Sequence, residues 1–591
     1  MTEDFQKLTL RSKAAWDLLS QKPWIRVGTG LFGEASGSLQ IIDEVYTAIK
    51  TNALEATVSE VGTSGLCYAE PLLDIQIPNM GRVIYGNVDP SNVEYIIKEH
   101  LAKGSPPKKF ALATIDCHLE GIPKFKDLPM MKGQIRIALR NAGEIEPGDI
   151  DQYIANNGFV GLDRALSEMD PSEVLGIIKS SGLRGRGGAA FSTGTKWGFL
   201  AGNTAPKKYI LCNGEEGDPG AFNDKAILET DPLSLIEGCI LAGYATNATN
   251  GVVFIRHGHD APIDRTNKAI DACYADGLLG KNILGSEFSF DMEVVLVGES
   301  YVAGEETALM EAVEGKRSMP RFRPPFPAAY GVWGFPSNIN NIKTISYAPE
   351  IVRNGPEWFS SIGTDKSKGT AIACLSGHIK FSGLVEVPFG TSIRKIVEQM
   401  GGGDPNSKSI KFLQTGGPLG GVLTNDQFDM LLDFDEMAAA GAMFGSGGLI
   451  VCNQETSSVD LTRVLIAFDQ MESCGKCFPC RLGTSHLLDI LDRACLGKSL
   501  SGDLQLMERV GQNMKVGSLC GHGQLGYNPV ASALKAFSSE FNQQMFGEGD
   551  IEIKKFVAPL HTRRGAQTLG ETPTSIVKED FTFEPKLEAS Q

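Results

Sequence analysis

The stretch KKYILCNGEEGDPGAF, residues 207–222, decides how the fold is interpreted. An apolar run ends there in a loop that holds three glycines and three carboxylates between positions 214 and 220. Two further apolar runs, NGVVFIRHG (250–258) and FDMEVVLVG (290–298), alternate with helical patterns. This alternation predicts a mostly parallel sheet covered by helices over about 145–370. Ligands of such sheets bind at the carboxyl ends of the strands, which is where the glycine-rich loops fall.

Composition limits the possible partners and surroundings of this 591-residue chain. Its net charge of −16 argues against nucleic acid, which needs a basic face. The first residues lack a signal-peptide pattern, and no apolar run reaches the roughly 18 residues of a membrane span. We therefore expect no direct membrane insertion. The twelve cysteines are too few for a disulfide scaffold in a chain of this length, so a cytoplasmic, reducing compartment is expected.

Several loops carry residues suited to nucleotide binding. Glycines in SGLRGRGGAAFSTGTKW (181–197) permit close approach of a phosphate or a flat ring, although a flexible surface loop is the alternative. The carboxylates of the 214–220 loop would repel phosphate, so we expect them to accept hydrogen bonds from ribose or nicotinamide. GTGLFG (28–33) resembles a dinucleotide fingerprint only weakly, because the next helix begins late. The candidate polar groups are Arg184, Arg186, Lys196, Glu215, Glu216, Asp218, Asn338, Asn340 and Asn341.

Three cysteines at two-residue gaps in SCGKCFPC (473–480) predict a metal centre. Cys474, Cys477 and Cys480 suit either an iron–sulfur cluster or zinc, the latter with His522. Two residues compete for the remaining thiolate. Cys495 ends a helical run in which a cysteine is more often core than ligand, whereas Cys520 lies among small residues in KVGSLCGHG (515–523).

Five motifs in order give the chain a family resemblance over about 145–545. They are GLRGRGGAAF, CNGEEGDPGAF, YVAGEETALMEAVEG, PPFPAAYGVWGFPSNINN and ESCGKCFPCRLGT. Together they resemble the NADH-binding flavoprotein subunit of respiratory complex I and the beta subunits of NAD-linked hydrogenases and formate dehydrogenases. The resemblance implies FMN, NAD(H) and a [4Fe–4S] cluster. It also implies that the fourth ligand is Cys520, and that GHIKFSGLVEVPFGTSI (377–393) belongs to a β-grasp, soluble-ligand-binding domain.

The same resemblance implies roles for individual residues of the flavin domain. Those that would line the flavin and dinucleotide are Gly185, Arg186, Gly187 and Gly188, and Lys196 would lie beside the flavin. Those that would hold the isoalloxazine ring or the ribityl phosphate are Asn213, Tyr301, Gly304, Glu305, Asn340 and Asn341. Those that would contact the nicotinamide nucleotide are Phe191, Asp218, Glu306 and Phe326.

The N-terminal region resembles a thioredoxin-like [2Fe–2S] domain that has lost its cluster. The stretches RVGTGL (26–31) and GTSGLC (62–67) keep the glycines of that pattern. Arg26, Leu31 and Thr63 stand at three ligand positions, and only Cys67 remains. One thiolate cannot hold the cluster, so we expect this domain to persist as a docking surface for a partner.

The sequence thus predicts a multidomain α/β protein. The expected domains are a degenerate thioredoxin-like domain at 1–105, a linker at 106–144, an FMN- and NAD(H)-binding domain at 145–370, a β-grasp domain at 371–455, a helical [4Fe–4S] domain at 456–545 and an extended tail at 546–591. We expect an NADH dehydrogenase flavoprotein subunit that exchanges electrons with thioredoxin-like or ferredoxin-like iron–sulfur subunits. The alternatives are a degenerate scaffold and a self-contained NADH diaphorase.

Overall fold

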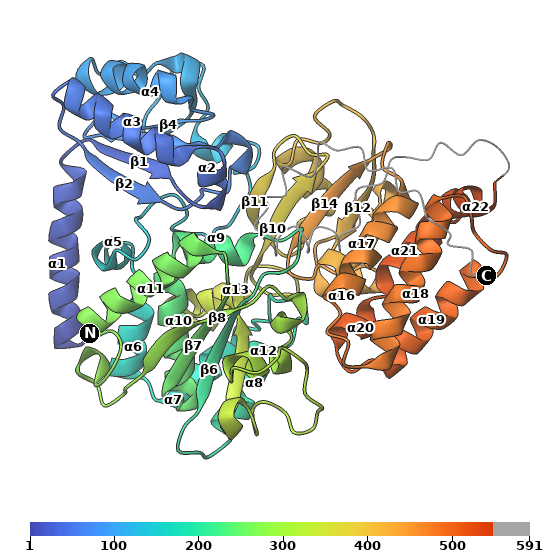
Figure 1. The fold of residues 1–591 in the computed structure, drawn as a ribbon. Helices are drawn as coiled ribbons and strands as arrows, with labels where there is room; N and C mark the ends of the chain where they lie inside the picture. Colours follow the sequence, from blue (N-terminus) through green and yellow to red (C-terminus); the bar gives the residue numbers. More distant parts are fainter. Residues whose placement is uncertain (548–591) are drawn as a thin grey trace. The chain divides into compact units, whose positions relative to one another are not determined.

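A computed structural model describes residues 1–547, and the chain divides into a unit at Met1–Glu455 and a helical unit that begins at Thr456. The first unit contains three separate sheets (Figure 1). This arrangement agrees with the expected multidomain α/β architecture. The tail expected over 546–591 lies outside the described residues from position 548 onward.

The first sheet has five strands in the order β2-β1-β3-β4-β5. They are β1 (Trp24–Gly28), β2 (Thr57–Val61), β3 (Leu73–Ile77), β4 (Gly81–Tyr85) and β5 (Ala111–Ile115). Strand β1 is parallel to β2, and every other pair is antiparallel. Helices α3 (Ser38–Thr51) and α4 (Pro90–Ile97) bury apolar faces in the core of this sheet. Strand β5 corrects the expected linker at 106–144, because this short run completes the sheet beside β4.

Helix α1 (Glu3–Ser20) also differs from the expected domain division. Its Phe5 and Leu8 are buried in the large apolar core that surrounds the second sheet, together with residues of α5 (Ile150–Ala155) and α6 (Val160–Glu168). Arg11 of α1 pairs with Asp151 at 2.8 Å and with Asp276 at 2.7 Å. The helix therefore packs on the following domain, although it precedes the first sheet in the sequence.

The second sheet is wholly parallel, as its apolar strands predict, with the order β8-β7-β6-β9. Its strands are β6 (Tyr209–Gly214), β7 (Asn250–Arg256), β8 (Asp291–Val297) and β9 (Ser337–Asn341). The chain moves outward from β6 to β8 and then returns to place β9 on the other side of β6. Such a reversal creates a crevice at the carboxyl ends of the two strands that flank it. That crevice lies between β6 and β9.

Helices surround this parallel sheet (Figure 1). They include α7 (Pro171–Ser180), α8 (Thr193–Ala201), α9 (Asn223–Thr230), α10 (Pro232–Thr246), α11 (Asp260–Ala275), α12 (Glu306–Val313), α13 (Ile342–Ser346), α14 (Ala348–Asn354) and α15 (Pro356–Ser360). Helix α10 is buried on nearly every side, because its own residues are apolar or small on almost all faces.

The third sheet begins where the sequence changes character, at Thr370. Its order is β11-β10-β14-β12-β13, and β10 and β14 are its parallel pair. The strands are β10 (Thr370–Gly377), β11 (Gly383–Pro388), β12 (Ile410–Thr415), β13 (Gly421–Thr424) and β14 (Gly448–Asn453). A π-helical turn at Lys395–Met400 and α16 (Phe434–Ala439) accompany this mixed sheet.

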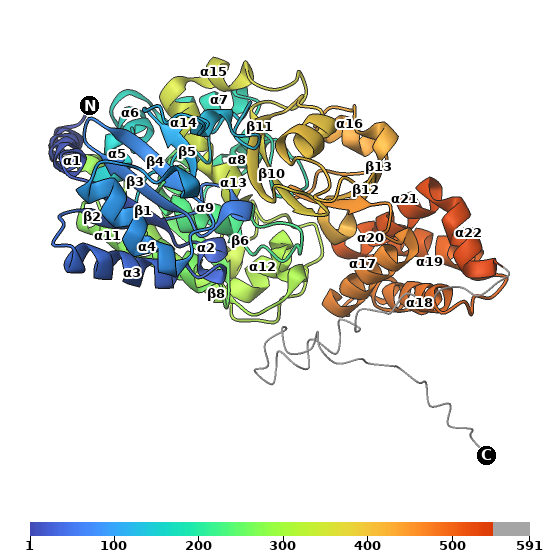
Figure 2. The ribbon, with the colours of Figure 1, turned by 90° about the horizontal axis from the view of Figure 1, so that it is seen from above.

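The unit that begins at Thr456 consists of helices as far as the structure describes it. Figure 2 shows them gathered in one bundle. They are α17 (Ser458–Glu472), α18 (Phe478–Cys495), α19 (Asp503–Gly517), α20 (Gly521–Leu525), α21 (Asn528–Ala536) and α22 (Ser538–Phe546). Within residues 1–547 no helix has both the length and the apolar character required to cross a lipid bilayer.

Candidate functional site

Two asparagines stand side by side where the parallel sheet reverses direction. Asn213 near the end of β6 pairs in register with Asn341 at the end of β9. Asn213 donates from Nδ2 to the Gly304 carbonyl at 2.8 Å. Asn341 donates from Nδ2 to Asp224 at 2.7 Å, and its Oδ1 accepts from the first turn of α13. Both predicted amides therefore lie at the crevice, in orientations held by neighbouring elements.

The glycine-rich loop between α7 and α8 approaches this crevice closely. A Cβ atom at Gly187 would lie 2.9 Å from the Cβ of Asn341, so the loop requires glycine there. Gly188 has a φ of +118°, which side chains rarely tolerate. Gly185 is hydrogen-bonded to the carbonyl of Phe191 at 2.8 Å, which closes the loop. The sequence-predicted glycines therefore bring backbone beside the ends of β6 and β9.

The two arginine side chains of this loop form hydrogen bonds and an ion pair with other groups of the chain. The Arg186 guanidinium is buried and donates to the carbonyls of Arg184, Lys368 and Thr370. Burial lowers the pKa of Arg186 to about 10. Arg184 donates to the Ala190 carbonyl and pairs with Asp435 at 3.1 Å. Both side chains hold the loop to neighbouring segments. The place of Arg186 beside the flavin and dinucleotide stays a prediction, and its burial is a feature that a pattern of residue types cannot reveal.

The three acidic residues after β6 have different partners. Glu216 accepts from the backbone N–H groups of Asp224 and Lys225 at the start of α9, at 3.0 and 2.9 Å. Burial alone would raise its pKa, but Lys225, Lys343 and the two backbone hydrogen bonds together leave the pKa below its ordinary value. Glu215 is buried and its Oε1 lies 3.6 Å from Arg256. Glu216 thus stabilises the start of α9 through these hydrogen bonds. Glu215 instead faces the loop around Gly304.

Asp218 lies where the parallel-sheet domain meets the third sheet. It accepts from Ser446 Oγ at 2.7 Å and from the Gly220 N–H at 2.9 Å. A Cβ atom at Gly417 would lie 2.3 Å from its Oδ2, so glycine is needed for this approach. Burial raises the pKa of Asp218. The third sheet thus helps to shape the surroundings of this carboxylate.

The segment after β8 supplies a capped helix and an ion-pair network. Glu305 is the N-cap of α12 and accepts from the N–H groups of Thr307 and Ala308 at 2.9 and 3.0 Å. Glu306 pairs with Lys196 at 3.2 Å and with Arg323 at 2.8 Å. Tyr301 lies beside the acidic loop, 3.0 Å from the position of a Cβ atom at Gly217.

Asn340 precedes Asn341 on β9, and two of the predicted aromatic residues are exposed. Asn340 donates to Asn338 at 2.7 Å and accepts from Trp197 at 3.2 Å. Phe191 and Phe326 are exposed by 50% and 58%, so their rings are accessible to a ligand.

A buried pair, Lys343 and Asp224, was not expected from the sequence. Their charged atoms lie 3.1 Å apart, and Lys343 also donates to Asn223 at 2.7 Å. Asp224 in turn holds Asn341, so this pair orients the amide at the crevice. The available signal was a lysine two positions after Asn341, between the isoleucines of NINNIKTI (338–345).

Four cysteines converge in the helical unit. Cys477 precedes α18, Cys480 lies in its first turn, and Cys520 precedes α20. Burial, together with the nearby thiols of Cys477, Cys520 and Cys474, raises the pKa of Cys480 to about 12. Leu519 donates its N–H to Cys477 Sγ at 3.5 Å. The donor set fits an iron–sulfur cluster, because all four groups are thiols and two helices begin among them.

Cys495 and His522 have other surroundings. Burial raises the pKa of Cys495 to about 12, and the charged groups that influence it are Asp460, Asp492 and Arg463. His522 Nε2 lies 2.9 Å from the Asp469 carbonyl oxygen. Within residues 1–547, no three side chains of the ligand-forming types stand close enough to hold a single metal ion.

Comparisons with known proteins agree with this geometry. The family description Nuo51 FMN-binding domain matches residues 178–350, and the description NADH-ubiquinone oxidoreductase-F iron-sulfur binding region matches residues 460–544. An NADH-quinone oxidoreductase subunit of Rhizobium meliloti is 39% identical over 405 residues, which cover 68% of this chain and 96% of that protein. The chain belongs to this oxidoreductase family. Its FMN-binding domain contains the crevice, and its [4Fe–4S] region contains the four thiols.

Other similar proteins extend the comparison from the oxidoreductase family to hydrogenases. NADP-reducing hydrogenase subunit HndC of Solidesulfovibrio fructosivorans is 46% identical over 430 residues, which cover 73% of this chain and 86% of that protein. The solved structure of an NAD+-reducing [NiFe]-hydrogenase in the air-oxidized state has a TM-score of 0.62 and 25% identity, and covers 93% of this chain and 90% of its own. The similarity therefore reaches beyond the two matched regions.

The positions that resemble cluster ligands near the N-terminus of this oxidoreductase are filled by protein contacts. The Arg26 guanidinium lies 3.3 Å from the Trp24 ring centroid and donates to Gln76 at 3.0 Å. Thr63 donates to Glu70 at 3.3 Å. Leu31 donates its N–H to Glu229 of α9 at 2.9 Å. These contacts use the space around the three positions for packing within the chain.

The loops that carry the cluster-like pattern, which we call the relic loops (26–31 and 62–67), are therefore covered by their own chain. A Cβ atom at Gly62 would lie 2.4 Å from Thr230, and one at Gly65 would lie 2.7 Å from the Leu384 carbonyl oxygen. We expected this domain to persist as a docking surface for a partner. The relic loops instead pack on α9 and on β11, so that hypothesis no longer applies to this face of the domain.

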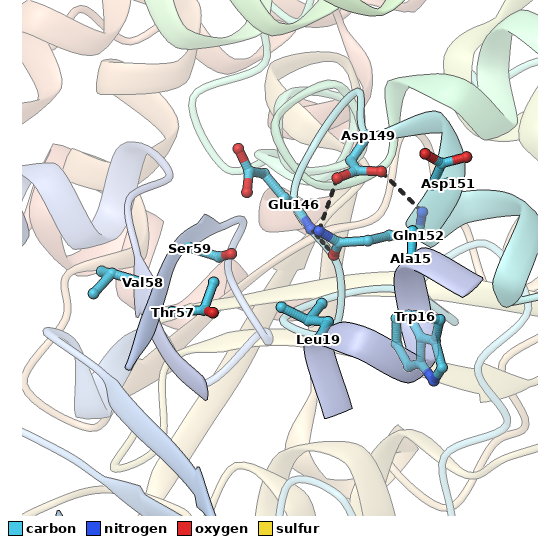
Figure 3. Close-up of a pocket in the computed structure, with 10 residues that line it drawn as sticks. All are labelled: Ala15, Trp16, Leu19, Thr57, Val58, Ser59, Glu146, Asp149, Asp151 and Gln152. Carbon is cyan, nitrogen blue, oxygen red and sulfur yellow. Dashed lines mark hydrogen bonds between the residues drawn. The ribbon is translucent and has the colours of Figure 1, made fainter. Parts of the chain in front are cut away.

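A cavity of about 260 Å³ lies between α1, β2 and the start of α5 (Figure 3). Asp149 on its wall caps α5 and accepts from Gln152 through both carboxylate oxygens at 2.9 Å. Glu146 donates its N–H to Gln152 Oε1 at 2.9 Å. The polar groups of this cavity thus serve the helix start, and none of the predicted site residues lines it.

Proposed function

We propose that this chain is the electron-input subunit of a multisubunit redox complex, in which it oxidises NADH and delivers electrons to iron–sulfur partners. The observation that carries the proposal is the meeting of Asn213, Asn341 and the glycine-rich loop at the strand reversal of the FMN-binding domain. An FMN held by these residues would supply the conversion between hydride transfer with NADH and single-electron transfer to the cluster.

The residues of the crevice bind and orient in this proposal. Asn213, Asn340 and Asn341 present preorganised amides to the flavin, and Gly187 and Gly188 allow close approach of the backbone. Phe191 and Phe326 offer exposed rings to the nicotinamide nucleotide. Hydride transfer itself needs no acid or base, so we assign no catalytic residue.

The remaining assignments concern the cluster and the domains. Cys474, Cys477, Cys480 and Cys520 are the proposed ligands of the [4Fe–4S] cluster, supported by their mutual proximity. We assign the first sheet, which now includes β5, to a thioredoxin-like domain without its cluster, and the third sheet to a β-grasp domain. The partners would be thioredoxin-like or ferredoxin-like iron–sulfur subunits, since the named relatives are subunits of larger enzymes.

Anaerobic purification tests the proposal. The full-length chain should contain FMN and about four irons, and NADH should bleach its flavin absorbance. Colourless protein that binds no FMN would favour the degenerate scaffold. Native purification separates the remaining alternative: a chain that elutes alone and completes its physiological reduction without partners would be a diaphorase.

A further inference from the structure

Lys343 is a buried lysine in the first turn of α13, two positions after Asn341. Its side chain is only 3% exposed, its ammonium lies 3.1 Å from the carboxylate of Asp224, and it donates to Asn223 Oδ1 at 2.7 Å. Burial strips the ammonium of most of its hydration, so proteins rarely bury a lysine without a specific partner. An apolar side chain of similar length would fill this space without that cost. The positive charge is therefore the feature to be explained.

Lys343 holds the amide of Asn341 from two directions. Its own backbone N–H donates to Asn341 Oδ1 at 3.0 Å. Its ammonium pairs with Asp224, which accepts from Asn341 Nδ2 at 2.7 Å. Lys343 is therefore a positioning residue for one of the amides that we assign to the flavin. The backbone contact does not depend on the side chain, so the charge of Lys343 can be removed while that contact persists.

The charge of Lys343 acts on more than one carboxylate. Burial raises the pKa of Asp218 and that of Asp224, and Lys343 opposes the shift in both. Lys225 and Lys343 together counteract burial at Glu216. Lys225 Nζ lies 3.6 Å from Glu216 Oε2. We call these five residues the crevice charge group. Its three carboxylates against two lysines leave one excess negative charge, and loss of Lys343 would double that excess.

We infer, on the basis of the electron-input function proposed above, that the buried charge of Lys343 sets the electron affinity of the flavin bound at this crevice. Hydride transfer from NADH moves two electrons and one proton, leaves NAD+ and adds one negative charge to the flavin ring. A cation beside the ring therefore favours the reduced form, and a carboxylate favours the oxidised form. Because Lys343 is buried, salt in the solvent screens its charge little.

The midpoint potential of FMN in the full-length holoprotein tests the inference by anaerobic spectroelectrochemistry. Lys343→Met should lower this potential by about 30 mV, which corresponds to a tenfold weaker preference for reduced over oxidised FMN in a two-electron couple. Asp224→Asn removes a charge of the opposite sign and should raise the potential by a similar amount. The Kd of oxidised FMN for the flavin-free protein, measured by fluorescence quenching, reports separately on damage to the site.

Two further variants separate charge from geometry. The double variant Lys343→Met/Asp224→Asn removes one charge of each sign, so its potential should return close to that of the unaltered protein. Lys343→Arg keeps the charge and should keep the potential. If Lys343→Met does not retain FMN, the rise expected in Asp224→Asn still tests the sign of the effect.

Lys208→Met is the matched control. Lys208 is 5% exposed and donates to the Thr246 carbonyl at 2.9 Å, and it directly precedes β6, at the end of that strand opposite to Asn213. The same substitution of a buried lysine there should leave the flavin potential unchanged.

Three outcomes would overturn the inference. The first is a potential that stays unchanged in both Lys343→Met and Asp224→Asn. The second is a shift of the two variants in the same direction, which would indicate a distorted site rather than a charge effect. The third is an equal shift in Lys208→Met. Failure of the proposed function looks different, because the unaltered chain would then bind no FMN and would show no flavin potential to compare.

Discussion

Cys520 and Cys495 are buried thiols of the same domain, but their different neighbours predict different roles. Cys520 lies among the other three proposed ligands, whereas Cys495 lies near Asp460, Asp492 and Arg463. Cys520→Ser should therefore lose the cluster, because a hydroxyl is a poor ligand for iron. Cys495→Ser should keep it, at a cost of about 1–3 kcal/mol in packing and hydrogen bonding. Iron content and the EPR spectrum of the reduced variants measure both, and the reverse pattern would exchange the two assignments.

The preference between NADH and NADPH should depend on Asp218 more than on Glu306, because two cations compensate the charge of Glu306. We expect NAD(H) to be preferred because Asp218 carries its charge near the proposed nucleotide site, where a 2′-phosphate would be repelled. Asp218→Asn should raise kcat/KM for NADPH about tenfold relative to NADH. The amide can still accept from Gly220 and bond Ser446, so the fold should persist.

Glu306 provides the control for this prediction. Its charge is compensated by Lys196 and Arg323, a pairing that the sequence did not reveal. Glu306→Gln should consequently change nucleotide preference less than Asp218→Asn does. Equal kcat/KM values for NADH and NADPH in the unaltered chain would contradict the electrostatic argument, and the relative named as NADP-reducing makes this comparison informative.

Residue types indicated candidate sites more readily than they indicated where individual side chains point. The cysteine spacing and the asparagines of β9 indicated candidate sites because few other roles suit these residue types. Arg186 was assigned to a ligand, yet its guanidinium binds three carbonyls of its own chain. A sequence records that an arginine is present, whereas the burial of its side chain depends on segments almost two hundred positions away.

At the scale of elements, α9 covers the relic loops partly through Glu229, whose carboxyl group has a raised pKa. Glu229 accepts from the Leu31 N–H at 2.9 Å, and its Oε1 has no hydrogen-bond partner in the described residues. Burial raises its pKa from 4.5 to about 7. A carboxyl with a raised pKa stabilises the fold most below about pH 4.5, and this contribution is lost as the pH rises to about 7.

Glu229→Gln should remove this pH dependence. The amide oxygen can still accept from Leu31 and carries no charge that must be buried. We expect the variant to exceed the unaltered protein by about 1–3 kcal/mol at pH 8 and to match it near pH 5. Urea unfolding at the two pH values measures the difference, with the exposed Glu55→Gln as control. A gain of equal size at both pH values would show that the carboxylate is not protonated in the fold.

Elements were predicted better than their partners. The parallel sheet followed from apolar runs, and its carboxyl ends located the crevice. Strand β5 was assigned to a linker, because a five-residue run carries little periodic signal before its pairing with β4 is known. Helix α1 shows the same limit, because Phe5 and Leu8 do not record in the sequence which core covers them.

At the scale of the whole molecule, the chain divides into one unit with the flavin domain and another with the cluster. The proposed ligands come from three places in the helical unit: the segment after α17, the start of α18 and the loop before α20. A cluster that joins these places restrains the unfolded helical chain much as a cross-link does. A helical domain of this size has little core to replace that restraint.

Removal of the cluster should therefore affect the two units unequally. Oxidative removal of iron, followed by chelation, should lower the Tm of the helical unit by more than about 10 °C, since 1 kcal/mol shifts a domain of this size by roughly 4–8 °C. The transition of the flavin-containing unit, its FMN content and NADH-driven ferricyanide reduction should persist, because the crevice uses residues of the first unit alone. Scanning calorimetry before and after treatment measures both transitions. One transition that moves as a whole, with loss of FMN, would show that the two units unfold as one.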